Sequence, residues 1–333
     1  MIDTAKETAK PVKTGKSEKK PFNARAVWQK YGIFGIFIII VALLGIMSPQ
    51  YFLTTNNLTQ VVLQSSITIL IACGEFFAIL IAGIDLSVGS VIALTGVVTA
   101  KLLMAGTPVI LAILIGGILV GALLGAINGG LVNLTGLHPF IITLGTMAIF
   151  RGVTLIISDA SPIFGFPQSF KDGVAGWLFG IPIPVLIALV VALVLHFITK
   201  KTIVGRNIYA LGGNTKSAWF SGINIKKHTL IVFIISGICA GIAGVVTTAR
   251  LGSAEPLAGQ GFETFAIASA IIGGTSFFGG KGYIPGVVMG GLIIGVINNG
   301  LNILNISTYY QQIVMGCLII AAVTLDKLLS AKK

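Results

Sequence analysis

About ten apolar stretches, each close to 20 residues long and separated by short joins, make up most of this 333-residue chain. A helix needs about 20 predominantly apolar residues to span the hydrocarbon core of a bilayer. Hydrophobic residues form 55% of the chain and charged residues only 10%, and no soluble fold of this length has enough interior to bury so much apolar surface. The sequence therefore predicts an all-α, polytopic integral membrane protein.

The predicted spans lie near residues 31–47, 60–82, 86–105, 108–133, 139–157, 182–199, 229–249, 262–280, 282–302 and 307–325. The second and third are the least regular, because Gly83, Asp85 and Gly89 can break the helix and form a re-entrant segment. We divide the chain into a basic tail over residues 1–30, a membrane domain over residues 31–328 and a short C-terminal end over residues 329–333. The tail is too polar and charged to pack, so we expect it to be disordered.

Cationic residues are concentrated in three places. Eight of the 22 Lys and Arg residues fall within residues 1–30, six within residues 200–228 and three after Leu325, and residues 200–228 contain no Asp or Glu. Cytoplasmic segments of membrane proteins are enriched in Lys and Arg. With the tail inside, six spans return the chain to the cytoplasm at residues 200–228, and ten spans leave the C-terminus there too. We therefore expect both termini to be cytoplasmic, and we attribute the net charge of +12 to topology and not to nucleic-acid binding.

Short sequence echoes suggest an internal repeat, a common feature of transporters. The echoes pair Glu75–Ile79 with Glu263–Ile267, Gly96–Val98 with Gly286–Val288, and Gly125–Leu131 with Gly295–Leu301. The shared order of the three pairs favours a duplication that would place Glu75 and Glu263 at related positions. Whether the two copies are parallel or inverted is left open by the sequence.

Charged side chains inside a bilayer cost at least about 2.5 to 3.5 kcal/mol each, so those within the predicted spans need an explanation. One interpretation is a polar path that hydrogen bonds to a hydroxyl-rich solute; its candidates are Glu75, Asp85, Ser87, Asn128, Thr143, Glu263, Asn298, Asn299 and Asn302. A second is structural: these groups satisfy the backbone of broken helices or join helices, and Arg151 pairs with a carboxylate. A third is a proton relay through Glu75 or Asp85.

Signals for catalysis and metal binding are weak. Segment Gly274–Gly282 faintly resembles a phosphate loop, but Lys281 is one residue late and no Ser or Thr follows it. The three histidines and three cysteines show no metal-ligand spacing. We expect no cofactor, no metal and no ATP hydrolysis by this chain itself.

Three segments carry a resemblance to a known family: Gly74–Gly89, Gly205–Asn214 with Ser221–Ile223, and Gly273–Gly282. They are similar to the permease subunit of ribose-type ATP-binding cassette sugar importers, over about residues 31–328. Segments Gly136–Thr146, Ser158–Ala160 and Ala254–Gly259 are most similar to the D-allose branch of that family. The resemblance implies a homodimer in the bacterial inner membrane that works with a cytoplasmic ATPase and an extracytoplasmic sugar-binding protein. It implies D-allose as the first candidate sugar and D-ribose as the next.

Within that resemblance, residues 200–228 are expected to be the cytoplasmic docking loop for the ATPase. A short helix over about Asn214–Ser221 would present Trp219 and Phe220, and aromatic residues are enriched at the cores of protein interfaces. Positive-inside statistics alone explain the lysines but do not require the two aromatic residues. The predicted coupling residues are Arg206, Asn214, Ser217, Trp219, Phe220, Ser221 and Gly222.

The sequence is compatible with three functions. The preferred one is a permease that moves a monosaccharide inward through the bilayer without chemistry of its own. The second is an ion-coupled sugar symporter that binds a proton at Glu75 or Asp85, and the third is a membrane scaffold with no transport path. ATP-dependent uptake that survives collapse of the proton gradient fits only the first.

Overall fold

The structure, a computed structural model, describes residues 24–330. The chain divides into two compact units, the first ending at Gly32 and the second beginning at Ile33. The helices are α1 (Ala24–Met47), α2 (Thr55–Leu80), α3 (Val88–Met104), α4 (Val109–Ala112), the π-helical η1 (Ile113–Leu119), α5 (Val120–Thr135), α6 (Pro139–Ser158), α7 (Gln168–Ala175), α8 (Ile183–Lys201), α9 (Ile203–Gly213), α10 (Thr215–Phe220), α11 (Ile225–Leu251), α12 (Phe262–Ile272), α13 (Ile284–Ile303) and α14 (Thr308–Ser330). A hairpin of β1 (Trp177–Leu178) and β2 (Ile181–Pro182) precedes α8.

Each predicted span coincides with a helical element, the fourth with the continuous run of α4, η1 and α5. Among the described residues, seven helices are long and apolar enough to cross a membrane, and three apolar helical segments are shorter, at Gly32–Met47, Val88–Met104 and Phe262–Ile272. The all-α, multi-pass prediction is therefore confirmed, and its count of ten is approximate.

Several boundaries differ from the prediction. The span expected over residues 262–280 is wrong at its C-terminal side, because α12 ends at Ile272 and a glycine-rich loop follows. Residues 200–228 contain two helices, α9 and α10, where the sequence suggested a loop with one short helix. The basic tail falls largely on residues 1–23, which lie outside the described residues, and α1 already begins at Ala24.

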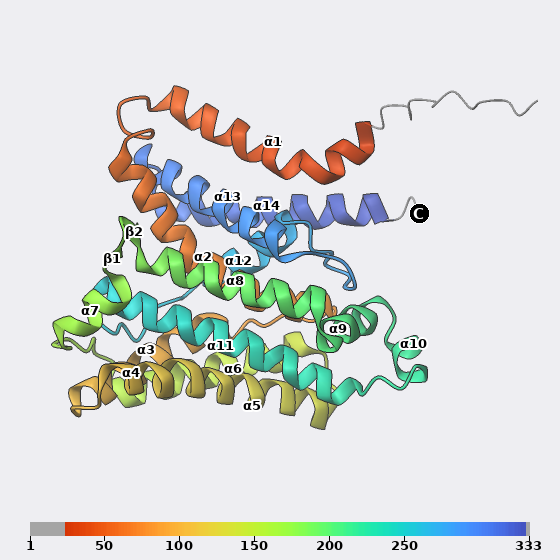
Figure 1. The fold of residues 1–333 in the computed structure, drawn as a ribbon, viewed down its shortest axis with the longest axis horizontal. Coiled ribbons are helices and arrows are strands. Elements are labelled where there is room, and N and C mark those ends of the chain that lie inside the picture. The colour runs from red at the N-terminus through yellow and green to blue at the C-terminus, as the bar shows by residue number, and fades with distance from the viewer. Residues whose placement is uncertain (1–23, 331–333) are drawn as a thin grey trace, which may run out of the picture. The chain divides into compact units, whose positions relative to one another are not determined.

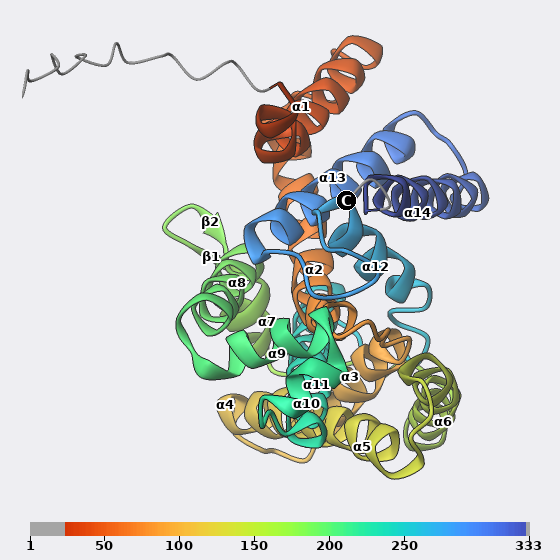
Figure 2. The same ribbon diagram turned by 90° about the vertical axis from the view of Figure 1, so that its right-hand side faces the viewer.

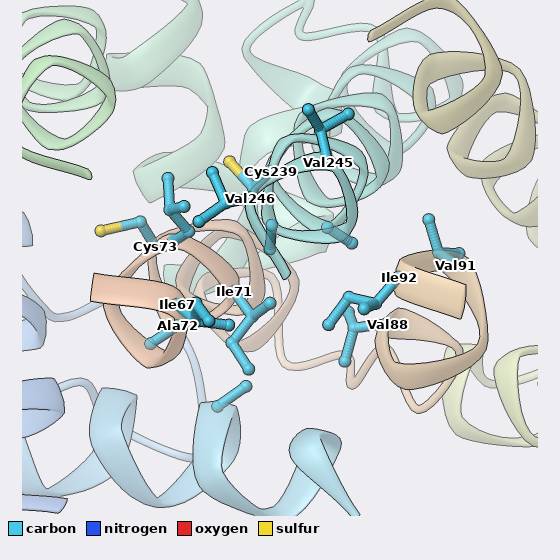
Figure 3. Packing of buried hydrophobic residues seen from close by; sticks show 14 of the residues in the cluster. Ile67, Ile71, Ala72, Cys73, Val88, Val91, Ile92, Cys239, Val245 and Val246 are labelled. Carbon is cyan, nitrogen blue, oxygen red and sulfur yellow. The ribbon is translucent and has the colours of Figure 1, made fainter. Parts of the chain in front are cut away.

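The core lies where α2, α3 and α11 meet. Figure 3 shows the labelled residues of this cluster: Ile67, Ile71, Ala72 and Cys73 from α2, Val88, Val91 and Ile92 from α3, and Cys239, Val245 and Val246 from α11. α2 is buried over most of its length, with Leu70, Phe76 and Phe77 fully inaccessible. A helix that is apolar all round and buried on every side is a central helix of the bundle.

Two sets of helices pack in the same way. α5 packs along α11 as α13 packs along α2, and α6 packs on α3 as α14 packs on α12. The C-terminal end of α2 and the N-terminal end of α11 both lie next to α9 and α10. The matched helices α2 and α11 therefore run in opposite directions, and so do the two sets. This packing is that of an inverted repeat, in which α2, α3, α5 and α6 correspond to α11, α12, α13 and α14.

Only one of the three sequence echoes agrees with this correspondence. Gly125–Leu131 lies on α5 and Gly295–Leu301 on α13, which are matched helices. Glu75 lies near the end of α2 and Glu263 at the start of α12, which are not matched. The expectation that Glu75 and Glu263 occupy related positions is therefore corrected, because short matches among Gly, Ala, Ile and Val recur by composition.

Glycines allow α5 and α11 to pack with their backbones in close contact. A Cβ atom on Gly125 would overlap the carbonyl oxygen of Phe233, and one on Gly121 would overlap that of Gly237. Without a hydrophobic driving force between helices in lipid, such close backbone packing is a main source of their association.

The two ends of the helical bundle differ in what they carry. α9 and α10 lie at one end with the C-terminal end of α14, and α7 with the β1–β2 hairpin lies at the other (Figure 1). Figure 2 shows α3 and α12 between α6 and α14. The three cationic regions predicted to be cytoplasmic include residues 200–228 and the end of α14, and these two lie at the same end of the bundle.

Candidate functional site

The chain breaks its helical course between α2 and α3, as the sequence predicted. Asp85 lies in this break and is almost completely buried. Its Oδ1 accepts hydrogen bonds from the Ser87 amide at 3.0 Å and the Ser87 hydroxyl at 2.6 Å, and its Oδ2 accepts one from Ser236 on α11 at 2.7 Å. The Asp85 amide donates to Glu75 Oε1 at 3.1 Å. A buried carboxylate needs such partners, and these bonds join the break to α2 and α11.

The network continues into α5 and α6. Asn128 Nδ2 donates to Ser87 Oγ at 2.8 Å, and Asn128 Oδ1 accepts from Thr146 Oγ1 at 2.6 Å. Thr143 Oγ1 donates to the carbonyl of Ile84 at 3.0 Å. The structure thus brings together five predicted residues, Glu75, Asp85, Ser87, Asn128 and Thr143. It adds Ser236 and Thr146, which the sequence analysis did not single out. We call these seven residues the buried network.

The asparagines of α13 lie apart from the buried network. Asn299 exchanges two hydrogen bonds with Asn57 on α2, at 2.8 and 3.0 Å. Asn302 Oδ1 accepts from Gln311 of α14 at 2.7 Å. Asn298 Oδ1 is buried without a hydrogen-bond partner among the described residues, as is Glu75 Oε2. Asn299 and Asn302 therefore join helices, and their contact with a solute stays a prediction.

An open cavity of about 270 Å³ lies between the starts of α3 and α12 and the middle of α6. Its polar lining consists of Ser90, Arg151, Gln260 and Glu263. Of the predicted path residues, Glu263 alone lines this cavity. Arg151 was recognised as a charge within a span, but Gln260 and Ser90 were missed, because a single polar residue in an irregular segment or a buried serine carries no pattern of its own.

The starts of α3 and α12 meet beside this cavity. A Cβ atom on Gly89 of α3 would overlap the carbonyl oxygen of Gly259, which precedes α12, and would come within 2.8 Å of the Glu263 carboxylate. Arg151 Nη1 donates to the carbonyls of Pro256 at 2.7 Å and Ala258 at 3.0 Å, which holds the segment before α12 against α6. The hydrogen-bond partners of Arg151 in the described structure are therefore these carbonyl groups, where the sequence interpretation expected a carboxylate.

A second candidate surface lies at the other predicted site, on α10. Asn214 Oδ1 accepts from the Ser217 amide at 2.9 Å and caps the helix, and Ser221 Oγ donates to the Ser217 carbonyl at 2.9 Å. Trp219 and Phe220 are 62% and 80% exposed, and their rings pack edge to face at 4.9 Å. An open hollow lined by Trp219 and residues 222–226 lies beside them. Arg206 is exposed on the neighbouring α9.

The loop over residues 273–283, here the glycine loop, connects α9, which precedes α10, to the membrane helices α2 and α14. The Gly280 amide donates to the carbonyl of Leu80 at the end of α2, at 2.9 Å. Tyr209 of α9 donates from its hydroxyl to the Gly282 carbonyl at 2.7 Å; partial burial raises the pKa of Tyr209 and keeps this donor protonated. Ser276 Oγ and the Phe277 amide both donate to Asp326 of α14 at 3.0 Å. The glycines of this phosphate-loop-like segment thus permit main-chain contacts.

Comparison with known proteins places the chain in a family. Residues 57–323 match the family described as branched-chain amino acid transport system, permease component. The chain belongs to this permease family. No solved structure matches the permease.

Curated relatives match the permease over nearly its whole length. It is 67% identical to the D-allose transport system permease protein AlsC of Escherichia coli, over 96% of this chain and 98% of the relative. It is 43% identical to the ribose import permease protein RbsC of Haemophilus influenzae, over 90% and 94% of the two chains. It is 37% identical to the galactose/methyl galactoside import permease protein MglC of Escherichia coli, over 91% and 95%.

Proposed function

We propose that this chain is the membrane-spanning subunit of an ATP-driven, binding-protein-dependent importer of a monosaccharide. The observation that carries the proposal is the 67% identity to a D-allose permease across 96% of the chain, on a fold made of membrane-length helices. The family description mentions branched-chain amino acids, whereas the relatives reported above are named for sugars. D-Allose is therefore the first candidate substrate and D-ribose the second.

The proposed assembly contains a cytoplasmic ATPase, an extracytoplasmic sugar-binding protein and a second copy of this chain. It lies in a bacterial inner membrane with both termini in the cytoplasm. The cationic residues of α8 to α11 and of the end of α14 support this orientation, since they lie at one end of the bundle. A closed two-fold pair would give a single shared path for the sugar.

The proposed coupling starts at α10. Trp219 and Phe220 are large, exposed and rigid, which suits an anchor in a groove of the ATPase. Movement of α10 and α9 reaches the membrane through the glycine loop, because that loop is hydrogen bonded to α2, α9 and α14 at once. Nucleotide-driven closure of the ATPase would in this way shift α2 and α14 without any chemistry in this subunit.

Uptake of labelled D-allose into vesicles tests this function. The permease, its ATPase and its binding protein are reconstituted together, with ATP enclosed on the ATPase side. We expect uptake that requires ATP and all three components and that persists when an uncoupler collapses the proton gradient. Uptake by the permease alone, driven by that gradient, would instead favour the symporter, for which Glu75 and Asp85 are the predicted proton sites. The comparisons offer no support for that alternative.

A further inference from the structure

The open cavity has features that the buried network lacks. Every member of the buried network is inaccessible in this conformation and is engaged in hydrogen bonds to protein groups. The open cavity instead has a half-buried Arg151, a half-buried Glu263 and an exposed Gln260 in its lining, beside α3 and α12, which lie between α6 and α14 in Figure 2. The polar groups of the cavity are therefore not enclosed by the core, unlike those of the buried network.

The lining of the cavity suits a small neutral polyol. Arg151 and Glu263 are the two charged side chains in it, one of each sign, so together they favour neither cations nor anions. The hydrogen bonds of Arg151 to described residues use only Nη1, which leaves Nε and Nη2 as free donors. The Glu263 carboxylate supplies acceptors, and the Gln260 amide supplies one of each kind. A sugar hydroxyl both donates and accepts, so adjacent hydroxyl groups can bridge these residues.

The size of the cavity limits the ligand. At about 270 Å³ it lies just below the range of about 300 to 1,000 Å³ found for small-molecule sites, which suits one monosaccharide ring better than two. None of the described residues that line it is aromatic, so stacking on a sugar face contributes nothing there. The site would bind weakly and release readily, as passage through a membrane requires.

We infer that Arg151, Gln260 and Glu263 form a contact site for the hydroxyl groups of a monosaccharide in transit, between the starts of α3 and α12. This inference rests on the proposed function, because it names the place in the permease where that sugar is held. It also gives the Glu263 carboxylate and the remaining donors of Arg151 a role that helix packing alone does not require.

The test uses the complete transporter in vesicles and compares D-allose with its singly deoxygenated analogues. Glu263→Gln and Gln260→Ala are the variants; Asp172→Asn on α7 and Gln60→Ala on α2, both exposed, are the matched controls. We expect Glu263→Gln to lower the maximal uptake rate of D-allose about tenfold, because a hydrogen bond to a charged carboxylate is replaced by a weaker one to a neutral amide. The controls should keep the rate of the unchanged protein.

The analogues distinguish contact from a structural role. If Glu263 contacts one hydroxyl, the analogue that lacks this hydroxyl should be slow in the unchanged protein and should lose nothing further in Glu263→Gln, as in a double-mutant cycle. An equal loss for every analogue, or no loss for any of them, overturns the inference. If the unchanged transporter moves no monosaccharide with ATP, the proposed function itself fails, which is a separate result.

A labelling experiment covers the case in which Glu263→Gln does not insert. Cys73 and Cys239 are buried and Cys317 is exposed, so Gln260→Cys is made in a Cys317→Ala background. Sugar-loaded binding protein with ATP should slow labelling of the new cysteine by a hydrophilic maleimide during turnover. Labelling that is unaffected by the sugar contradicts the inference.

Discussion

The Gly280 amide donates a hydrogen bond of 2.9 Å to the carbonyl of Leu80, which joins the glycine loop to the last turn of α2. Gly212 at the end of α9 packs against the same two groups, so closely that a Cβ atom there would overlap the Leu80 oxygen. Three segments that are far apart in the sequence thus meet through main-chain atoms. The joint lies between the predicted docking surface on α10 and the helices of the membrane.

A methyl group at Gly212 should disturb this joint. We expect Gly212→Ala to insert into the membrane and to bind the ATPase but to transport poorly, because α9 can no longer sit against Leu80. Gly213→Ala is the matched control, since nothing lies within 4 Å of a Cβ atom at that position. Uptake and sugar-stimulated ATPase rates in vesicles measure the effect. Equal transport by the two variants would remove the joint from the coupling route.

Removing the exposed aromatic pair on α10 should uncouple the transporter. Trp219→Ala with Phe220→Ala is expected to leave the thermal unfolding midpoint nearly unchanged, since both rings are largely exposed, and to abolish ATP-driven uptake. Phe197→Ala on α8, a ring of similar exposure, is the control. Co-purification of the ATPase reports docking directly. Normal uptake by the double variant would exclude α10 from docking.

The contact between α5 and α11 should tolerate no side chain at Gly125. Gly125→Ala is expected to lower the free energy of unfolding in detergent by about 1 to 3 kcal/mol, the usual cost of overpacking. Gly130→Ala on the same helix has open space around its Cβ atom and should gain up to about 1 kcal/mol from the better helix propensity of alanine. Thermal unfolding of the two purified proteins tests the difference. A similar midpoint for both would mean that the helices separate easily.

Ser236 holds the buried carboxylate of Asp85 across two helices. We expect Ser236→Ala to cost about 1.5 to 3 kcal/mol, because a hydrogen bond to a charged group is lost inside the protein. Ser269→Ala, whose hydroxyl donates to the Phe265 carbonyl of its own helix, should cost less. Denaturation of the two variants gives both values. If Ser269→Ala proves the more damaging change, Asp85 is not held as the structure indicates.

The proposed orientation can be tested by labelling at Lys216. A Lys216→Cys variant in the Cys317→Ala background should react with a membrane-impermeant maleimide only after the inner face is exposed, because the exposed α10 would lie in the cytoplasm. Reaction from outside intact cells would reverse the topology and remove the ATPase from α10.

Hydropathy alone located the membrane helices well, since a span of lipid demands a length and a composition that few other structures share. The break before α3 was also predictable, because Gly83 and Asp85 disfavour a continuous apolar helix. The early end of α12 at Ile272 was not, because a glycine pair such as Gly273-Gly274 also occurs inside a helix, as Gly290-Gly291 does in α13. Hydropathy does not distinguish a packed glycine from one that ends a helix.

The candidate site was predicted in part. Buried polar residues are few in such a chain, so Asp85, Ser87 and Asn128 stood out, and the structure joins them in one network. Their partner Ser236 lies on a distant helix, and only the fold reveals that pairing. Gln260 became a candidate solely because the segment before α12 folds back against α6.

α3 has 17 residues and α12 has 11, so at about 1.5 Å per residue both fall short of the hydrocarbon thickness and rely on non-helical segments for the remainder. Tilting either one changes torsion angles in those segments and leaves the long helices unbent. The transport path could therefore open to one face of the membrane and then to the other by exchanging a few main-chain hydrogen bonds in these segments. The long helices around it would not need to bend.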